Sequence, residues 1–221
     1  AGTLEGDGDG NSPGVPGHPR SGGLAAWNAM RFPGTMATRT RSRGDRMEGM
    51  KVVYSGPVDV CYGQVYATSP GCAPVLLEQA LAGQDNGLCG AGVTGGLLLM
   101  CGLHSGRVQL EVLSFPAEPP VEATWPEVVE APFRFLSAPV VLEDWEGRTL
   151  CTLPIDGPGY MARWCARNFG EAEDAGRADD DEPFEEYALH LWPAARPAER
   201  IVRETGDRAG YWHRYAKSLH G

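Results

Sequence analysis

The sequence predicts a mainly β protein, an antiparallel β-sandwich with one short helix and a C-terminal helix. Three observations lead to this fold class. Short runs of β-branched and aromatic residues follow one another after residue 50, and Gly and Pro separate them at fairly even intervals. The regular strand–helix alternation of a parallel α/β sheet does not occur. This combination is typical of antiparallel β folds.

The first fifty residues differ from the rest of the chain. They contain eleven glycines and four prolines and show neither helical nor strand periodicity. Such a segment buries too little apolar surface to offset its conformational entropy. We therefore expect residues 1–50 to form a disordered arm and residues 51–221 a single β-sandwich domain. Met36, Met47 and Met50 are alternative natural starts, and a tag or an over-long gene prediction would add an arm of this kind.

The first half of the domain carries four expected strands. Residues 52–55 and 58–67 are rich in β-branched and aromatic side chains, with a Gly-Pro pair between them. Residues 97–103 are a continuous apolar run, which is typical of a buried strand. Residues 107–115 alternate between apolar and polar side chains, and a His-Ser-Gly turn joins these last two strands as a hairpin.

The second half of the domain carries five more. Residues 133–136, 140–144 and 149–153 are short strand-like runs separated by Pro or Gly. Residues 160–169 and 186–192 alternate, so that one set of side chains faces the core and His190 falls on the solvent face. The expected inner sets are Tyr160, Ala162, Trp164 and Ala166 in the first strand and Tyr187, Leu189 and Leu191 in the second.

Two regions have helical patterns. Residues 74–81 begin with Pro, which suits a first helical turn, and carry a leucine and alanine stripe at helical spacing. Residues 198–204 and 207–219 have the composition of a C-terminal helix that Gly206 and Gly210 interrupt. The second of these segments carries Tyr211, Trp212 and Tyr215.

Charge restricts the classes of partner. The chain has a net charge of −10, and because the six arginines and five acidic residues of the arm give +1, the domain carries −11. A domain this acidic lacks the basic face that nucleic acid or anionic lipid requires, so we expect neither partner. A basic protein fits better. Without a signal peptide, a membrane-spanning run or paired cysteines, the cytoplasm is the expected location.

Known catalytic and ligand motifs are absent from the sequence. It contains no phosphate-binding loop, no G-x-S-x-G elbow and no H-E-x-x-H pair. The acidic run that starts at Asp7 begins like a calcium loop, but Ser12 and His18 occupy the positions that require Gly and Glu. We therefore expect no cofactor, no metal site and no catalytic residue.

The acidity is concentrated in one loop between two aromatic-rich strands. Carboxylates gathered in this way would steer a basic partner and pair with its Lys and Arg side chains. The expected partner-binding residues are Glu171, Glu173, Asp174, Asp179, Asp180, Asp181 and Glu182.

Two alternatives to a binding protein stay open at this point. One is a small enzyme with a site in the loops of residues 83–107, where a carboxylate, a thiol, an imidazole and a guanidinium could meet in three dimensions. Its pocket candidates are Asp85, Cys89, His104 and Arg107. The other is a structural or assembly protein that associates through its C-terminal aromatic helix.

The C-terminal half carries a family resemblance. Gly159-Tyr160-Met161-Ala162-Arg163, the run from Tyr187 to Ala194 and Tyr211-Trp212-His213 resemble uncharacterised actinobacterial β-sandwich proteins, as does the run from Val58 to Gln64. The arrangement is also similar to the competence nuclease-inhibitor proteins. The resemblance implies a β-sandwich and an inhibitor or immunity protein for a basic partner such as a nuclease. With the missing catalytic motifs, it favours a non-enzymatic binding or regulatory protein.

Overall fold

The computed structural model describes residues 49–157, 159–174, 182–194 and 198–220. Most of the arm and the acidic residues Asp179, Asp180 and Asp181 lie outside these ranges. The described helices are α1 (Leu77–Leu81), α2 (Glu171–Asp174) and α3 (Asp207–Ser218). The strands are β1 (Lys51–Cys61), β2 (Gln64–Thr68), β3 (Cys89–Gly90), β4 (Gly96–Met100), β5 (Ser105–Ser114), β6 (Glu127–Phe133), β7 (Val140–Glu143), β8 (Thr149–Leu153), β9 (Tyr160–Arg167), β10 (Glu186–Pro193) and β11 (Arg200–Arg203).

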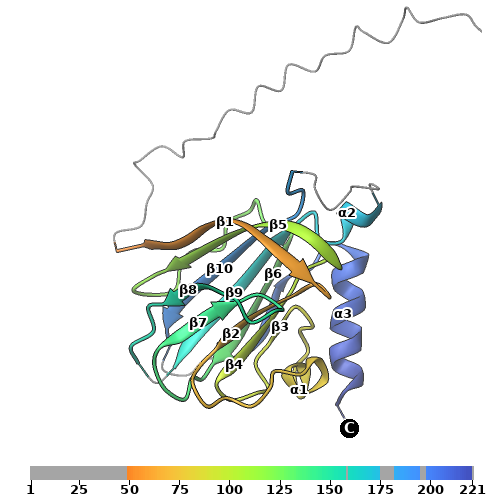
Figure 1. Cartoon of the computed structure of the whole chain (residues 1–221). Coiled ribbons are helices and arrows are strands. Elements are labelled where there is room, and N and C mark those ends of the chain that lie inside the picture. Colours follow the sequence, from red (N-terminus) through yellow and green to blue (C-terminus); the bar gives the residue numbers. More distant parts are fainter. Residues whose placement is uncertain (1–48, 158, 175–181, 195–197, 221) are drawn as a thin grey trace, which may run out of the picture. The chain divides into compact units, whose positions relative to one another are not determined.

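Within these ranges, eleven strands join in one mixed sheet (Figure 1). The order along the sheet is β11-β6-β9-β10-β5-β1-β2-β4-β3, and β7 and β8 branch from β2. The mainly β prediction is confirmed, but the antiparallel sandwich is not: these strands form one sheet, and β10 pairs with β5 in parallel. Side-chain alternation shows which face a residue occupies and carries no information on strand direction, so the sequence could not reveal this pair.

One face of the sheet encloses the main core. Strands from both ends of the path share this core, including β2 and β4 from one end and β6 and β9 from the other. The Trp164 and Tyr187 rings stack in it with centroids 5.0 Å apart, and Trp164 Nε1 donates to the Met100 carbonyl over 2.8 Å. The predicted inner sets of β9 and β10 are confirmed, because every member belongs to this main core.

At β9 and β10 the second face is also buried, which makes the solvent position predicted for His190 wrong. His190 is only 4% exposed and lies under Phe115, with ring centroids 5.2 Å apart. The segment that follows β5 contacts this face again at Trp125, whose ring lies 4.7 Å from the Arg167 guanidinium. The prolines of this segment predict the end of β5. They do not predict that the segment turns back and covers the second face of the sheet.

A buried ion pair lies in the middle of the second face. Arg163 of β9 donates to Glu130 of β6 over 2.7 Å, and both side chains are at most 1% exposed. Arg163 also donates to the Pro119 carbonyl and lies over the Trp192 ring. The other Glu130 oxygen accepts from Arg200 over 2.6 Å. This network therefore connects β6, β9 and β11 with the segment after β5.

The expected hairpin of residues 97–103 and 107–115 is wrong, because β4 pairs with β2 and β3 whereas β5 pairs with β1 and β10. Three further element predictions are also wrong. Residues 198–204 contain strand β11, not a helix, because Ile201 pairs with Val129 and Arg200 reaches Glu130. The strand expected at residues 133–136 is wrong beyond its first residue, because β6 ends at Phe133. Two prolines in and beside β6 masked it, although Pro132 is accommodated opposite Met161. Residues 52–61 are one strand that continues through the Gly-Pro pair.

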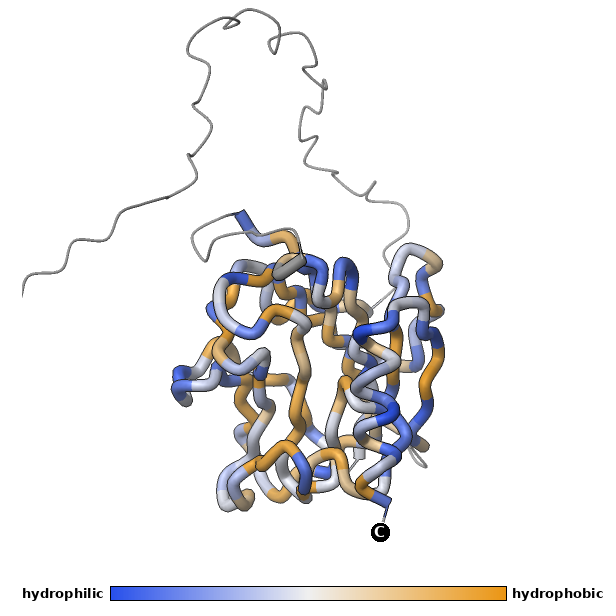
Figure 2. The backbone as a smooth tube through the Cα atoms, turned by 90° about the vertical axis from the view of Figure 1, so that its right-hand side faces the viewer, coloured by the Kyte–Doolittle hydropathy of each residue, from blue (hydrophilic) through white to orange (hydrophobic). Residues whose placement is uncertain are grey.

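The expected short helix and C-terminal helix are confirmed as α1 and α3, although α1 is shorter than predicted. Figure 2 views the molecule from the α3 side, where α3 is largely hydrophilic and apolar strand segments lie behind it. None of the described helices has the length and apolarity needed to cross a membrane. Helix α3 packs closely on the residues before β3: a Cβ at Gly87 would lie 2.0 Å from the Trp212 carbonyl oxygen.

His213 connects α3 to the same segment. Its Nδ1 accepts a hydrogen bond from the Gly87 amide over 2.9 Å, and the ring is 2% exposed. Burial lowers the His213 pKa below its ordinary value of 6.5, Lys217 lowers it further, and Glu204 and Glu199 act in the opposite direction. The native protein therefore favours the neutral imidazole, whose lone pair the Gly87 amide requires.

This linkage predicts a loss of stability in acid. Because the pKa is lower in the folded than in the unfolded state, the unfolded chain binds more protons, so stability is lost as pH falls below 6.5. Urea unfolding at about pH 7.5 and about pH 5.5 should show a larger decrease for the wild type than for His213→Asn, which keeps an acceptor that does not titrate. Equal decreases in the two proteins would contradict the assignment.

Candidate protein-binding surface

Three loops meet where β1 and β2 separate. The β1–β2 turn is formed by Tyr62 and Gly63, residues 101–104 join β4 to β5, and residues 144–148 join β7 to β8. Strands β1 and β2 pair only next to their turn, at Cys61 and Gln64, and β7 pairs with β2 beyond that point. We call the side chains at this junction the fork surface; they are Asp59, Tyr62, Tyr66, His104, Arg107, Glu143, Trp145 and Arg148.

Glycine and a strained tyrosine build the β1–β2 turn. Gly63 has a φ of 63° and Tyr62 a φ of 55°, as in the type I′ turns that suit tight hairpins. The Gly63 amide donates to the His104 carbonyl over 2.8 Å, and a Cβ at Gly63 would lie 2.8 Å from the Cys101 oxygen. A bulky residue in the left-handed region is unusual, and such strain is concentrated at functional sites.

Relief of this strain can be measured in two Tyr62 variants that both lack the ring. We expect Tyr62→Asn to unfold with a free energy about 1 kcal/mol higher than Tyr62→Ala, because Asn tolerates left-handed backbone and Ala does not. Urea titrations of the two variants test this. Equal stability would mean that the turn relaxes once the ring is removed.

Buried Glu185 holds the β4–β5 loop in place. Its carboxylate accepts from the amides of Gly102 over 3.1 Å, Leu103 over 2.9 Å and Gly170 over 2.9 Å, and from the Tyr187 hydroxyl. Burial raises the Glu185 pKa above its ordinary value, and these hydrogen bonds act against that rise. The loop that presents His104 is therefore anchored to the core by a fixed carboxylate.

Asp144 shapes the third loop. Its Oδ1 accepts from the backbone amides of Glu146 and Arg148 over 3.0 and 2.9 Å, and its Oδ2 accepts from Arg148 Nε over 2.8 Å. The charged Asp144 side chain is only 3% exposed, and its ion pair with Arg148 compensates that burial. This network closes the turn and places Trp145 at its tip.

Aromatic rings form the centre of the fork surface. The Tyr62 ring lies 4.7 Å from that of Trp145 and 5.1 Å from that of His104, between centroids. Tyr66 adds a ring 6.2 Å from Trp145. Tyr62 remains 54% exposed and Trp145 43%. Two large rings are thus held in fixed positions while much of their surface faces water.

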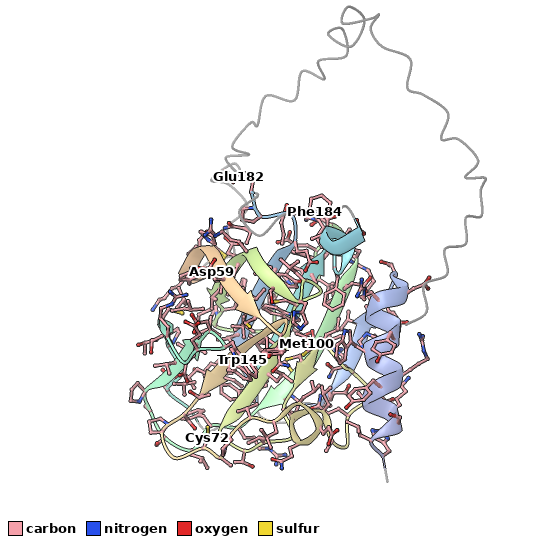
Figure 3. All side chains as sticks on the ribbon, turned by 45° about the vertical axis from the view of Figure 1, so that its right-hand side comes forward. Asp59, Cys72, Met100, Trp145, Glu182 and Phe184 are labelled. Atoms are coloured by element: carbon pink, nitrogen blue, oxygen red, sulfur yellow. The ribbon has the colours of Figure 1, made fainter. Side chains whose placement is uncertain are left out.

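Charged side chains at the edge are paired with one another. Arg107 Nε lies 3.1 Å from Asp59 Oδ1, and Arg148 lies 3.8 Å from the other Asp59 oxygen. Both Asp59 and Trp145 can be located in Figure 3, on the part of the sheet away from α3. An aromatic centre with a polar, charged rim is the usual anatomy of a protein–protein interface.

The outward face of β2 continues this surface. Tyr66 donates its hydroxyl to Gln64, and Thr68 donates to Glu143, which lies directly opposite Tyr66 in the sheet. Burial raises the Tyr66 pKa to about 12, so the phenol stays a neutral donor at all physiological pH values. The Glu143 carboxylate is thereby fixed next to the aromatic centre.

The structure brings together only part of the residues predicted for a pocket. His104 and Arg107 belong to the fork surface. Asp85 lies 4.0 Å from His220, after α3, and Cys89 is fully buried, where burial raises its thiol pKa far above the ordinary value. An enzyme site in residues 83–107 stays a prediction.

The structure describes only the two ends of the acidic loop predicted to bind a partner. Glu171, Glu173 and Asp174 belong to α2, where Glu171 is exposed. Glu182 is also exposed and lies at the upper end of the molecule in Figure 3, away from Trp145. Its part in binding stays a prediction. Among the described residues, no three His, Cys, Asp or Glu side chains are grouped so that they could hold a metal ion.

Sequence reasoning did not identify Tyr62 or Trp145 as a pair. Tyr62 lies inside a run that reads as one long strand, and Gly63 was the available signal for a turn within it. Trp145 lies in a turn, where the neighbouring residues in the sequence do not indicate which side chains its ring contacts. Only the pairing of β7 with β2 brings the two rings together.

No family model matches the chain, and no curated protein is similar to it. Two solved structures are similar. One is described as Crocagin biosynthetic gene J, with 12% identity and a TM-score of 0.42, covering 67% of this chain and 99% of that one. The other is ComJ from Bacillus subtilis, described as an inhibitor of the DNA degrading activity of NucA, with 11% identity and a TM-score of 0.47, covering 66% of this chain and 98% of that one. The resemblance to the competence nuclease-inhibitor proteins is thus supported as a faint likeness, and that to actinobacterial proteins stays a prediction.

Proposed function

We propose that this chain is a non-enzymatic binding protein that captures a basic protein partner, such as a nuclease, through the fork surface and inhibits it. The observation that carries the proposal is the pair of exposed rings, Tyr62 and Trp145. Tyr62 lies on a strained turn, its ring contacts that of Trp145, and the nearby Asp59 is already paired with Arg107.

The rings supply the contact area. Tyr and Trp are enriched among the residues that dominate binding energy, and rigid rings lose little conformational entropy when a partner covers them. Tyr62 and Trp145 hold each other in position before binding, so that the partner meets a preformed surface. The folded chain leaves the apolar area of these rings exposed to water, so covering it with a partner would favour binding.

The charge of the chain supports a basic partner. A net charge of −10 repels acidic proteins and nucleic acid and accelerates encounter with a cationic protein. Proteins that cleave nucleic acid carry basic faces for phosphate contacts. An acidic binding protein that covers such a face blocks access of the phosphate backbone, which is the simplest route to inhibition.

The proposal predicts a loss of binding in two variants. Tyr62→Asn and Trp145→Ser are each expected to weaken capture of the partner about thirtyfold or more, the effect of removing a residue at the centre of an interface. Affinity capture from a lysate of the source organism at increasing salt measures this. The captured protein should be basic, be released between about 50 and about 500 mM salt, and lose activity when the chain is bound.

Tyr211→Ser is the matched control, because Tyr211 is as exposed as Tyr62 but lies on α3. It should capture the partner like the wild type. If Tyr62→Asn and Trp145→Ser retain the partner, the fork surface is not the interface. If the captured protein is acidic, the basic-partner proposal is wrong.

A further inference from the structure

The fork surface has one charged group that its own residues do not neutralise. Asp59 is paired with Arg107, and Asp144 with Arg148. Glu143 accepts a hydrogen bond from Thr68, but in the described ranges no Lys, Arg or His lies within salt-bridge distance of it. This half-buried carboxylate is therefore held in place without a cation.

Aromatic surface lies next to this carboxylate. Glu143 and Tyr66 are directly paired residues of β7 and β2, so their side chains leave the same face of the sheet. The Tyr66 ring lies 6.2 Å from that of Trp145, two residues beyond Glu143. A carboxylate beside exposed ring faces is the chemistry that attracts a cation through both its charge and the ring quadrupole.

We propose that the fork surface binds the guanidinium of an arginine side chain of its partner, against the Trp145 ring and in an ion pair with Glu143. This inference rests on the proposed function and specifies the partner's anchoring residue. A guanidinium fits better than an ammonium, because its plane stacks on an indole while its edge donates two hydrogen bonds to one carboxylate. Thr68 occupies Glu143 Oε1 from within the sheet and fixes the carboxylate for that contact.

The test uses the tripeptide acetyl-Gly-Arg-Gly-amide as the probe and the full chain labelled with ¹⁵N. Trp145→Phe identifies the indole signal of Trp145. The arginine peptide is expected to shift this signal with a Kd on the order of 10 mM, as for a single anchoring side chain. The citrulline peptide, which has the same shape without charge, should bind at least about tenfold more weakly, and the lysine peptide at least about threefold more weakly.

Two variants locate the carboxylate. Glu143→Gln should weaken binding of the arginine peptide at least about fivefold. Glu146→Gln, a change of an exposed carboxylate in the loop that follows β7, should alter the Kd by less than about twofold. Equal binding of the citrulline or lysine peptide, an unchanged Kd in Glu143→Gln, or no shift of the Trp145 signal at about 50 mM peptide would overturn the inference. If the arginine peptide does not bind while Tyr62→Asn and Trp145→Ser still lose capture of the partner, that result contradicts the arginine anchor and leaves the proposed function supported.

Discussion

Glu130→Gln is expected to lower the free energy of unfolding by about 3 to 5 kcal/mol, the effect of leaving a buried charge without its partner. Arg163 is 1% exposed and lies 2.7 Å from Glu130. Its remaining contacts are the Pro119 and Pro120 carbonyls, the Trp192 ring and the exposed Glu118 carboxylate at 3.5 Å, and none of them replaces a buried negative charge at 2.7 Å. The loss should be accompanied by detachment of β11, because Arg200 reaches the same carboxylate.

Glu118→Gln is the matched control for this effect. Glu118 pairs with Arg200 over 2.7 Å and approaches Arg163 at 3.5 Å, but it is 56% exposed. Water screens this carboxylate, so its loss should lower the unfolding free energy by less than about 1 kcal/mol. Urea titrations followed by circular dichroism measure both variants. If Glu130→Gln loses no more stability than Glu118→Gln, the buried pair does not stabilise the second face as described.

Gly87→Ala is the second large expected effect, with a loss of about 3 kcal/mol or more. The added Cβ would lie 2.0 Å from the Trp212 carbonyl oxygen and 2.3 Å from the carbonyl carbon, and these are backbone atoms that cannot move by a change of rotamer. Helix α3 must shift, which also breaks the hydrogen bond between the Gly87 amide and His213.

Hydrogen exchange distinguishes this effect from general destabilisation. Amides of α3 should exchange faster in Gly87→Ala than those of β9 and β10, because the collision affects only the docking of the helix. Gly157→Ala is the control, since no heavy atom lies within 4 Å of its added Cβ. Unchanged exchange in α3 would show that the helix tolerates the extra atom.

The sequence predicted those elements whose residues carry their own periodic signal. The inner sets of β9 and β10 and the extent of α3 follow from local alternation and helical spacing, which depend on the chain near each residue. Strands β6 and β11 lack that signal. In β6, Pro132 is a residue that normally argues against a strand. In β11, the strand depends on contacts with β6, such as that of Arg200 with Glu130, 70 residues away in the sequence.

Most of the candidate site could not be predicted from the sequence, because it also depends on contacts between residues that are distant along the chain. Tyr62 and Trp145 are 83 residues apart, and nothing near either one indicates the other. The clustered acidic residues are evident in the sequence, and they led to the prediction that the loop after β9 binds the partner. The structure adds a surface where fewer charges are present but the rings are fixed, which composition alone does not reveal.

The parallel pair of β5 and β10 has a consequence for how the chain folds. Strand β5 can pair with β1 soon after both are synthesised, but its other edge stays open until residues 115–185 have followed and β10 arrives. Pairings this distant in sequence form slowly, because the intervening loop must close first. During that interval the apolar face of the β1–β5 pair is exposed to other chains. Newly made protein should therefore depend on low concentration or chaperones until its last third has emerged.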